Sequence, residues 1–308
     1  LVQRVVGYSK SPSTVERARR MGVIDIAAES ALLAVSGSDI VLIAVPVAAS
    51  EGTFKSIRHL VNPGVLFMDV GSTKREVIDA ARRVLRDQVG MFVPAHPITG
   101  KELSGVEHAD ADLYTGRQVI LTPIERTLTV QLNKAQAVWT ALGCHVKQMS
   151  PEAHDAAYAA VSHLPHMIAF ALMNAIQGQA QGEEFLSLAG PGFRDFTRIA
   201  ASDPKLWIQI LAANAVEVAP VLKAFESDLH AVVESLENIE QAGSLAKVSR
   251  ALEAGNQGVE RIPGKHGTKQ TAYAQVVVMI ADKPGELGRL FNEVGEIGVN
   301  IEELKLEH

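Results

Sequence analysis

Short β-branched runs alternate with amphipathic stretches over residues 3–133, and this alternation constrains the fold more than any other feature of the sequence. It is typical of βαβ units that build a parallel sheet. Residues 39–45 form an apolar run of the kind found in strands buried on both faces, and Pro46 ends it. The pattern predicts a doubly wound parallel sheet, on which ligands bind beyond the carboxyl ends of the strands. Further strands are expected at residues 4–8, 65–69, 91–94 and 118–121, and helices at 13–21, 49–60 and 74–87.

The β signal disappears after residue 150, and long amphipathic periods continue to about residue 254 with a break at Gly190-Pro191-Gly192. A first domain over residues 1–150 and an all-helical domain over 151–254 are therefore expected. Residues 255–272 combine glycines with polar side chains, which predicts a linker. The remaining residues, 273–308, predict one βαβ unit, with strands at 274–280 and 299–306 and a helix that begins near residue 284.

The composition is that of a folded globular protein, with 47% hydrophobic and 21% charged residues. The net charge is −6 and the basic residues are scattered along the chain. Because nucleic-acid binding requires a concentrated basic surface, we expect no nucleic-acid partner.

Cys144 is the only cysteine, so no intrachain disulfide can form and a reducing cytoplasm is the expected location. The most apolar long stretch, residues 156–176, contains His163, Pro165 and His166 in its middle, so we expect no membrane-spanning helix there. The chain begins with Leu1 and lacks a signal-peptide pattern, so its start is interpreted as cut.

Three predicted strand ends carry polar or glycine-containing turns, at residues 44–46, 69–74 and 95–100, and these turns should converge on one crevice. His96 is the side chain best suited to proton transfer near neutral pH, and Ser72 could orient it. A histidine before a proline is also a common hydrogen-bonded turn residue. Its position at a strand end in the expected crevice favours the catalytic interpretation.

The helical region contributes two further groups. His163 and His166 flank a proline in an apolar run, which indicates a kinked core helix with two hydrogen-bonded histidines. No acidic residue or second cysteine stands at ligand spacing, so we expect no metal site. Arg194 and Arg198 lie beside aromatic residues and could bind a carboxylate, although exposed arginines usually pair with a nearby acid.

Four motifs in order resemble those of prephenate dehydrogenases over about residues 5–252. They are DVGSTK at 69–74, HPITGKELSGV at 96–106, SHLPH at 162–166 and FRDFTR at 193–198 followed by Trp207. The segment DKPGEL at 282–287 with GVNI at 298–301 resembles the first half of an ACT domain, a ferredoxin-like amino-acid-sensing module. The resemblance implies a Rossmann-like domain, an all-helical dimerisation domain and a partial ACT βαβ unit.

The resemblance also implies a reaction, the oxidative decarboxylation of prephenate to 4-hydroxyphenylpyruvate, or of arogenate to tyrosine. Neutral His96 would accept a hydrogen bond from the ring hydroxyl while Ser72 holds the imidazole, and Arg198 and His166 would bind and position a substrate carboxylate. Because protonated His96 could not accept this bond, kcat/KM is expected to fall at acid pH as His96 is protonated. Further candidate substrate contacts are Thr99, Gly100 and Trp207, and the candidate cofactor contacts are Ser9, Lys10, Val45, Pro46, Ser72 and Pro97.

The cofactor is expected to be NAD or NADP. The usual Gly-x-Gly-x-x-Gly turn is absent, so the first βα unit is interpreted as missing. Where an acidic residue would bind the ribose of NAD, the chain has Ser9-Lys10-Ser11, which suits the 2′-phosphate of NADP better. The ACT unit is likewise expected to continue beyond His308, and tyrosine is an expected effector of the intact protein.

Two other interpretations stay open. One is a hydroxyacid dehydrogenase of the same two-domain plan, which would need a catalytic lysine such as Lys205 or Lys223; the other is a non-catalytic nucleotide and amino-acid sensor. The wide apolar stripes over residues 201–250 predict a homodimer, with a self-contained bundle as the alternative. Prephenate and arogenate are not distinguished by the sequence.

Overall fold

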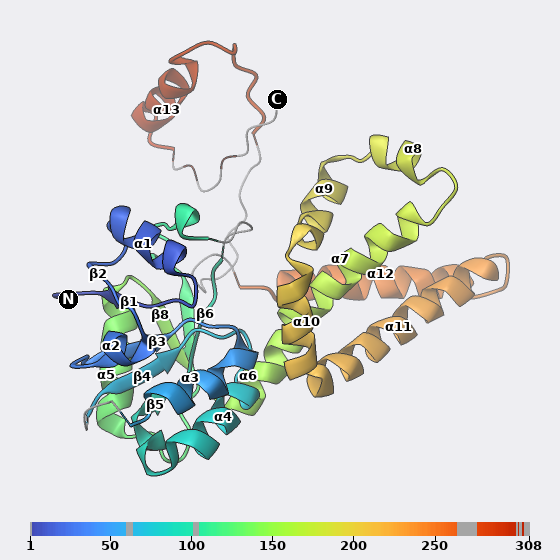
Figure 1. The fold of residues 1–308 in the computed structure, drawn as a ribbon. Coiled ribbons are helices and arrows are strands. Elements are labelled where there is room, and N and C mark those ends of the chain that lie inside the picture. The colour runs from blue at the N-terminus through green and yellow to red at the C-terminus, as the bar shows by residue number, and fades with distance from the viewer. Residues whose placement is uncertain are drawn as a thin grey trace. The chain divides into compact units, whose positions relative to one another are not determined.

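The computed structural model describes residues 2–59, 64–100, 105–263, 276–299, 301 and 304. The chain divides into two units, Leu1–Gly255 and Asn256–His308. The first contains an α/β region followed by helices, and each unit is described by itself below (Figure 1).

Parallel strands form the centre of the α/β region, as predicted. The order is β3-β4-β5, with Ile40 of β3 paired to Leu66 of β4, and β1 and β2 form a second parallel pair. The strands are β1 (Val6–Gly7), β2 (Ile26–Ala27), β3 (Ile40–Ile43), β4 (Leu66–Asp69), β5 (Phe92–Val93), β6 (Ala95–Pro97), β7 (Gln118–Leu121) and β8 (His145–Gln148).

The sequence did not predict the pairing in a further three-stranded sheet, β6-β7-β8. β6 follows β5 after Pro94 and pairs antiparallel with β7, which in turn pairs parallel with β8. The residues of β2, β6 and β8 were not predicted as strands, because β2 is only two residues long and β8 is mostly exposed. The turn predicted at residues 95–100 is wrong for residues 95–97, which form the short strand β6.

Both faces of β4 are buried, which explains its continuous apolar sequence. Phe67 packs into one hydrophobic cluster with α3 and α4, whereas Leu66 and Met68 pack into a second cluster with α5. Figure 1 shows these helices on opposite sides of the strands. The doubly wound arrangement is therefore confirmed. The helices of this region are α1 (Pro12–Arg20), α2 (Ala31–Val35), η1 (Val47–Ala49), α3 (Ser50–Ile57), α4 (Arg75–Leu85), η2 (Arg86–Met91), η3 (Val106–His108) and α5 (Thr129–Ala141).

The second part of the first unit is entirely helical, as predicted. Its last helix continues to Glu260, so residues 255–260 are helical turns rather than the start of a linker. The elements are α6 (Pro151–Tyr158), η4 (Ala159–His163), α7 (Leu164–Gln177), α8 (Gly182–Ser187), α9 (Pro191–Thr197), η5 (Arg198–Ala201), α10 (Pro204–Ala213), α11 (Ala215–Glu237) and α12 (Ser244–Glu260).

α6, η4 and α7 form one continuous helix, and η4 is a π-helical turn placed just before Pro165. Such turns widen the helix locally and are frequent at functional sites. Among the described residues, this helix is long and apolar enough to cross a membrane, and the bent pair α10 and α11 passes the same test if counted as one span. The continuous helix nevertheless buries His154 and Asp155, the second of which binds the start of α4.

In the second unit, α13 (Glu286–Glu296) forms where the sequence predicts a helix, after Gly285 with a φ of 93° that favours glycine. The predicted strand at 274–280 is wrong for its described part, residues 276–280, which form no strand. Val277 is 83% and Met279 95% exposed, because a strand needs a hydrogen-bonded neighbour and the described residues of this unit provide none. Residues 274 and 275 and most of 299–306 lie outside the described residues.

Candidate active site

His96 lies on β6 and forms a hydrogen bond with a histidine of the helical region. Its Nδ1 lies 2.8 Å from Nε2 of His154, which is 58 residues away in sequence. The Tyr158 ring packs against both imidazoles, with centroid separations of 5.0 and 4.6 Å. His96 itself is of intermediate exposure, whereas its neighbours Ala95 and Pro97 are buried.

His154 is fully buried and bonded in turn to a buried carboxylate. Its Nδ1 lies 2.8 Å from Oδ1 of Asp155. The backbone amides of Lys74 and Arg75 donate to the two oxygens of Asp155, at 2.8 and 2.9 Å. These amides stand at the beginning of α4, so a carboxylate of the helical region caps a helix of the α/β region.

A buried ion pair holds the turn after β4 against the strand that carries His96. Nζ of Lys74 donates to Oδ2 of Asp69 at 2.6 Å and to the carbonyl oxygen of Ala95 at 2.7 Å. The backbone amides of Ala95 and Gly71 donate to the Asp69 carboxylate. Because Ala95 immediately precedes His96, this pair fixes the backbone position of the imidazole.

The electrostatic environment keeps the site histidines neutral. Burial, followed by the positive charge of Lys74, holds the pKa of His96 well below the usual 6.5. Burial also lowers the pKa of His154. Burial alone would raise the pKa of Asp155, but the hydrogen bonds from His154, Arg75 and Lys74 outweigh it and lower that pKa, so Asp155 is ionised.

A second group of side chains is connected to the hydrogen-bonded series His96, His154 and Asp155. Nδ2 of Asn214 donates to the Asp155 carbonyl oxygen at 2.8 Å and lies 3.3 Å from Nδ1 of His163. The rings of His163 and Trp207 pack edge to face with their centroids 5.9 Å apart, and Trp207 stacks on His166 with a centroid separation of 3.9 Å. Burial lowers the pKa of His163 to about 4.

Arg198 stands at the start of η5, close enough for its charge to act on His166. Burial lowers the pKa of His166, the hydrogen bond of its Nδ1 to the Ser162 carbonyl oxygen opposes this, and the positive charge of Arg198 lowers it further. The structure thus connects the His96 group to Arg198 through successive contacts of His163, Trp207 and His166.

Comparison with known proteins identifies the family. The prephenate dehydrogenase nucleotide-binding domain matches residues 2–148, and the prephenate dehydrogenase dimerization domain matches residues 150–250. The chain belongs to the prephenate dehydrogenase family. The α/β region and the helical region of the first unit therefore correspond to the two domains of this family.

Individual members of the family agree with this assignment. Cyclohexadienyl dehydrogenase of Zymomonas mobilis is 34% identical over 224 residues, which cover 72% of this chain and 76% of that protein. Prephenate dehydrogenase of Bacillus subtilis is 30% identical over 297 residues, 94% of this chain and 77% of that protein. The structure of prephenate dehydrogenase from A. aeolicus in complex with hydroxyphenyl propionate and NAD+ aligns with a TM-score of 0.74 and 30% identity, covering 84% of this chain and 90% of that one.

Some residues predicted from the family motifs lie together and others do not. His96, His166, Arg198 and Trp207 belong to the connected groups described above. Among the described residues Ser72 forms no hydrogen bond with His96, whose Nδ1 is instead bonded to His154. The remaining candidates lie at or just after strand ends. They are Pro97, the last residue of β6; Thr99, whose hydroxyl donates to the Leu113 carbonyl oxygen; Gly100, which is exposed; Val45 and Pro46 after β3; and Ser9 and Lys10 after β1.

Sequence reasoning missed His154, Asp155, Asn214 and the role of Lys74. A histidine next to an aspartate in an otherwise alanine-rich first turn was the available signal for the pair. Lys74 is the last residue of the DVGSTK motif, and nothing in the local sequence indicates that its side chain is fully buried. The competing interpretation required a catalytic lysine of the helical domain, whereas the lysine within this site comes from the α/β region.

The turns at the carboxyl ends of β1, β3 and β4 fit a nicotinamide dinucleotide. A Cβ on Gly71 would lie 2.9 Å from both Oδ2 of Asp69 and Cγ2 of Val47, so only glycine allows the backbone there to approach the turn after β3 this closely. Ser9 and Lys10 present a hydroxyl and an ammonium group before the start of α1, a donor set that suits a phosphate. The family match to a nucleotide-binding domain supports the use of NAD(P).

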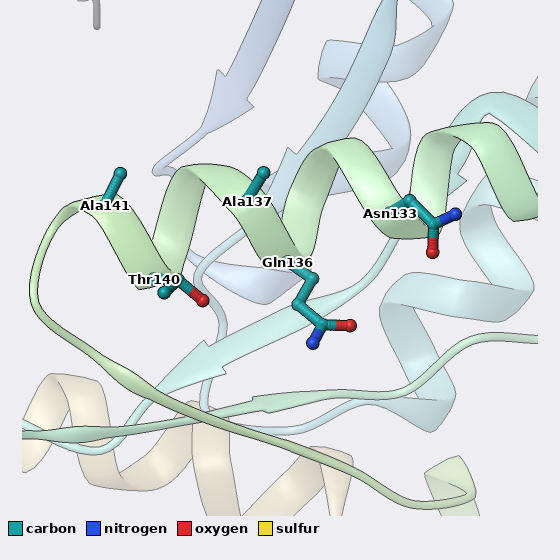
Figure 2. Close-up of a pocket in the computed structure, with 5 residues that line it drawn as sticks. All are labelled: Asn133, Gln136, Ala137, Thr140 and Ala141. Carbon is teal, nitrogen blue, oxygen red and sulfur yellow. The ribbon is translucent and has the colours of Figure 1, made fainter.

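The open hollow along α5 is chemically different from this site. Figure 2 shows that Asn133, Gln136, Ala137, Thr140 and Ala141 line it. None of these side chains ionises near neutral pH, so the hollow offers no group for acid–base catalysis.

Proposed function

We propose that this chain catalyses the oxidative decarboxylation of prephenate to 4-hydroxyphenylpyruvate, or of arogenate to tyrosine, in tyrosine biosynthesis. The observation that carries the proposal is His96, a partly exposed histidine whose imidazole is kept neutral and is hydrogen-bonded to the buried pair His154 and Asp155, in a chain that contains the nucleotide-binding domain of the family. Such a base matches the one proton that the reaction must remove from the substrate hydroxyl.

The residues of this chain would divide the work as follows. His96 accepts a hydrogen bond from the ring hydroxyl and takes its proton as the ring carbon gives up hydride. The bound nicotinamide supplies the hydride acceptor. The bond to the ring carboxylate then breaks, carbon dioxide leaves, and its electron pair completes the aromatic ring, which makes the step effectively irreversible.

Substrate anchoring falls to the second group of side chains. We assign Arg198 to a substrate carboxylate, since a guanidinium can form two parallel hydrogen bonds with it. His166 is stacked on Trp207 and bonded to the Ser162 carbonyl oxygen, so its orientation is fixed for a positioning role. We propose Thr99 and Gly100 as further substrate contacts because they lie just after β6, the strand that carries His96.

We favour NADP over NAD, because Ser9 and Lys10 can bind a 2′-phosphate. Val45, Pro46, Ser72 and Pro97 remain proposed cofactor contacts. Steady-state assays with prephenate and arogenate, each with NAD+ and NADP+, test both the reaction and this preference when they are made on a protein with a complete nucleotide-binding domain. Activity with at least one of the four pairs is expected, and inactivity of that protein with all four would end the enzyme interpretation.

We also propose that the chain forms a homodimer through its helical domains. The exposed apolar side chains of α11 and α12, around a cavity of about 700 Å³, support this assembly.

We further propose an ACT module that binds tyrosine, which the Pro284-Gly285 turn followed by α13 supports. Unchanged activity of a protein with a complete module at saturating tyrosine would rule this out. We propose a cytoplasmic location, since Cys144 is a buried free thiol.

A further inference from the structure

We propose that His154 and Asp155 act as a tautomer-setting relay, which fixes the proton of His96 on Nδ1 and leaves the Nε2 lone pair free to accept the substrate hydroxyl. This inference rests on the proposed function for its consequence in catalysis, but the protonation pattern itself is a property of the free protein. Neither His154 nor Asp155 touches the substrate in this scheme, so both are positioning residues.

The pattern begins at the carboxylate. Asp155 is almost fully buried and receives N–H donors on both oxygens, from Lys74 and Arg75. An ionised carboxylate accepts hydrogen bonds and has no proton to donate. The 2.8 Å contact between Oδ1 of Asp155 and Nδ1 of His154 therefore requires the proton to reside on Nδ1 of His154.

The second step follows from the neutrality of His154. A fully buried imidazole whose pKa burial has lowered carries one proton, so its Nε2 has a lone pair. Nδ1 of His96 lies 2.8 Å from this atom and must be the donor. The opposite nitrogen of neutral His96, Nε2, is then the acceptor that the reaction needs.

The charged and titratable groups around His96 are compatible with this pattern. Lys74 opposes protonation of His96, while Asp69 lies at 2.6 Å from the Lys74 ammonium and balances its charge. His163 is neutral above a pH of about 4, and burial raises the pKa of Tyr158 to about 12. Asp155 is the remaining acid of the relay, and it bonds to His154 rather than to His96.

The alternative is that Asp155 serves only to cap α4. The variant Asp155→Asn changes the relay and keeps part of the cap. With its NH₂ group in the place of Oδ1, it would donate to Nδ1 of His154 and move the His154 proton to Nε2. Its amide oxygen could still accept from the Arg75 amide, whereas the Lys74 amide would lose its acceptor. His96 would then accept on Nδ1 and carry its proton on Nε2, which turns the substrate-facing nitrogen into a donor.

Two measurements test the relay. Multiple-bond ¹H–¹⁵N spectra of histidine-labelled protein should show the Nδ1–H form for His96 in the wild type and the Nε2–H form in Asp155→Asn, with the His96 signal assigned through His96→Asn. The kcat of Asp155→Asn should fall on the order of 10²-fold to 10⁴-fold, with a much smaller change in KM.

The matched control is Glu217→Gln, which breaks the ion pair with Arg75 at the same end of α4 and leaves the relay intact. We expect this variant to keep kcat within about twofold, because exposed or half-exposed pairs contribute little. An Nε2–H signal for wild-type His96 would overturn the relay, even if Asp155→Asn does not fold. The relay would also be overturned if folded Asp155→Asn kept both the His96 tautomer and the kcat of the wild type. If the protein showed the expected spectrum but were inactive with every substrate, the relay would stand and only the proposed reaction would be overturned.

Discussion

At the scale of single residues, the site depends on imidazoles that stay uncharged near neutral pH. A histidine that must accept a hydrogen bond is useful only above its pKa. Burial and the nearby ammonium of Lys74 both shift the pKa of His96 in the direction that preserves the neutral form. The relay adds orientation to this, because it decides which of the two ring nitrogens presents a lone pair.

The first prediction concerns pH. The kcat/KM should be constant from about pH 8 down to pH 6.5 and fall only at lower pH, because the folded-state pKa of His96 lies well below 6.5. The fall occurs on the acid side, since protonation removes the acceptor. Measurement of kcat/KM from pH 4 to 8 checks this, and a limb centred at or above 6.5 would contradict it.

The second prediction concerns the buried ion pair. Lys74→Met should destabilise the fold by about 3–5 kcal/mol, because it leaves the buried Asp69 carboxylate without its cation. The double variant Asp69→Asn, Lys74→Met should recover much of this loss. Urea unfolding gives both values. Lys55→Met, which breaks the exposed Lys55–Glu51 pair, should cost less than about 1 kcal/mol and serves as the control.

At the scale of elements, local patterns predicted the strands of the sheet but not the contacts between distant segments. His96 was identified because strand ends converge in a doubly wound sheet, a rule that needs only local periodicity. His154 and Asp155 were missed because their partners lie 58 and 81 residues away. The strand predicted at 274–280 did not form over residues 276–280, since β structure requires a neighbour that no local pattern specifies.

The third prediction belongs to the turn between β4 and α4. Gly71→Ala should lower stability by about 1–3 kcal/mol and reduce kcat/KM, because the added methyl group would push the turn away from Asp69 and Val47. Thermal unfolding and steady-state kinetics measure the two effects. Gly52→Ala is the control, because Gly52 lies within α3 with open space around its Cβ position. That variant should gain up to about 1 kcal/mol.

At the scale of the whole molecule, the helical domain leaves many apolar side chains at its surface. The apolar stripe that predicted a dimer is partly used within the chain, since Ile210 and Val218 are buried. Leu229 and Leu236, by contrast, are 52% and 53% exposed. Exposed apolar side chains beside the cavity between α11 and α12 are what a subunit interface would cover.

The fourth prediction tests this assembly. Sedimentation at micromolar concentration should give twice the chain mass of 33.0 kDa. Leu229→Asp should shift the protein to the monomer, because it places a charge in the interface. Val130→Asp, at a position 66% exposed on α5 of the α/β region, should remain dimeric. A wild-type monomer would refute the proposed interface.

The cap that Asp155 provides for α4 links the contact between the helical and α/β regions to the protonation pattern of the site histidines. If the helical and α/β regions moved apart, the displacement would leave the first amides of α4 without their acceptor and would break the hydrogen bond between His154 and His96. The proton of His96 would then no longer be fixed on Nδ1, so the irreversible loss of carbon dioxide would begin only while the two regions are in contact.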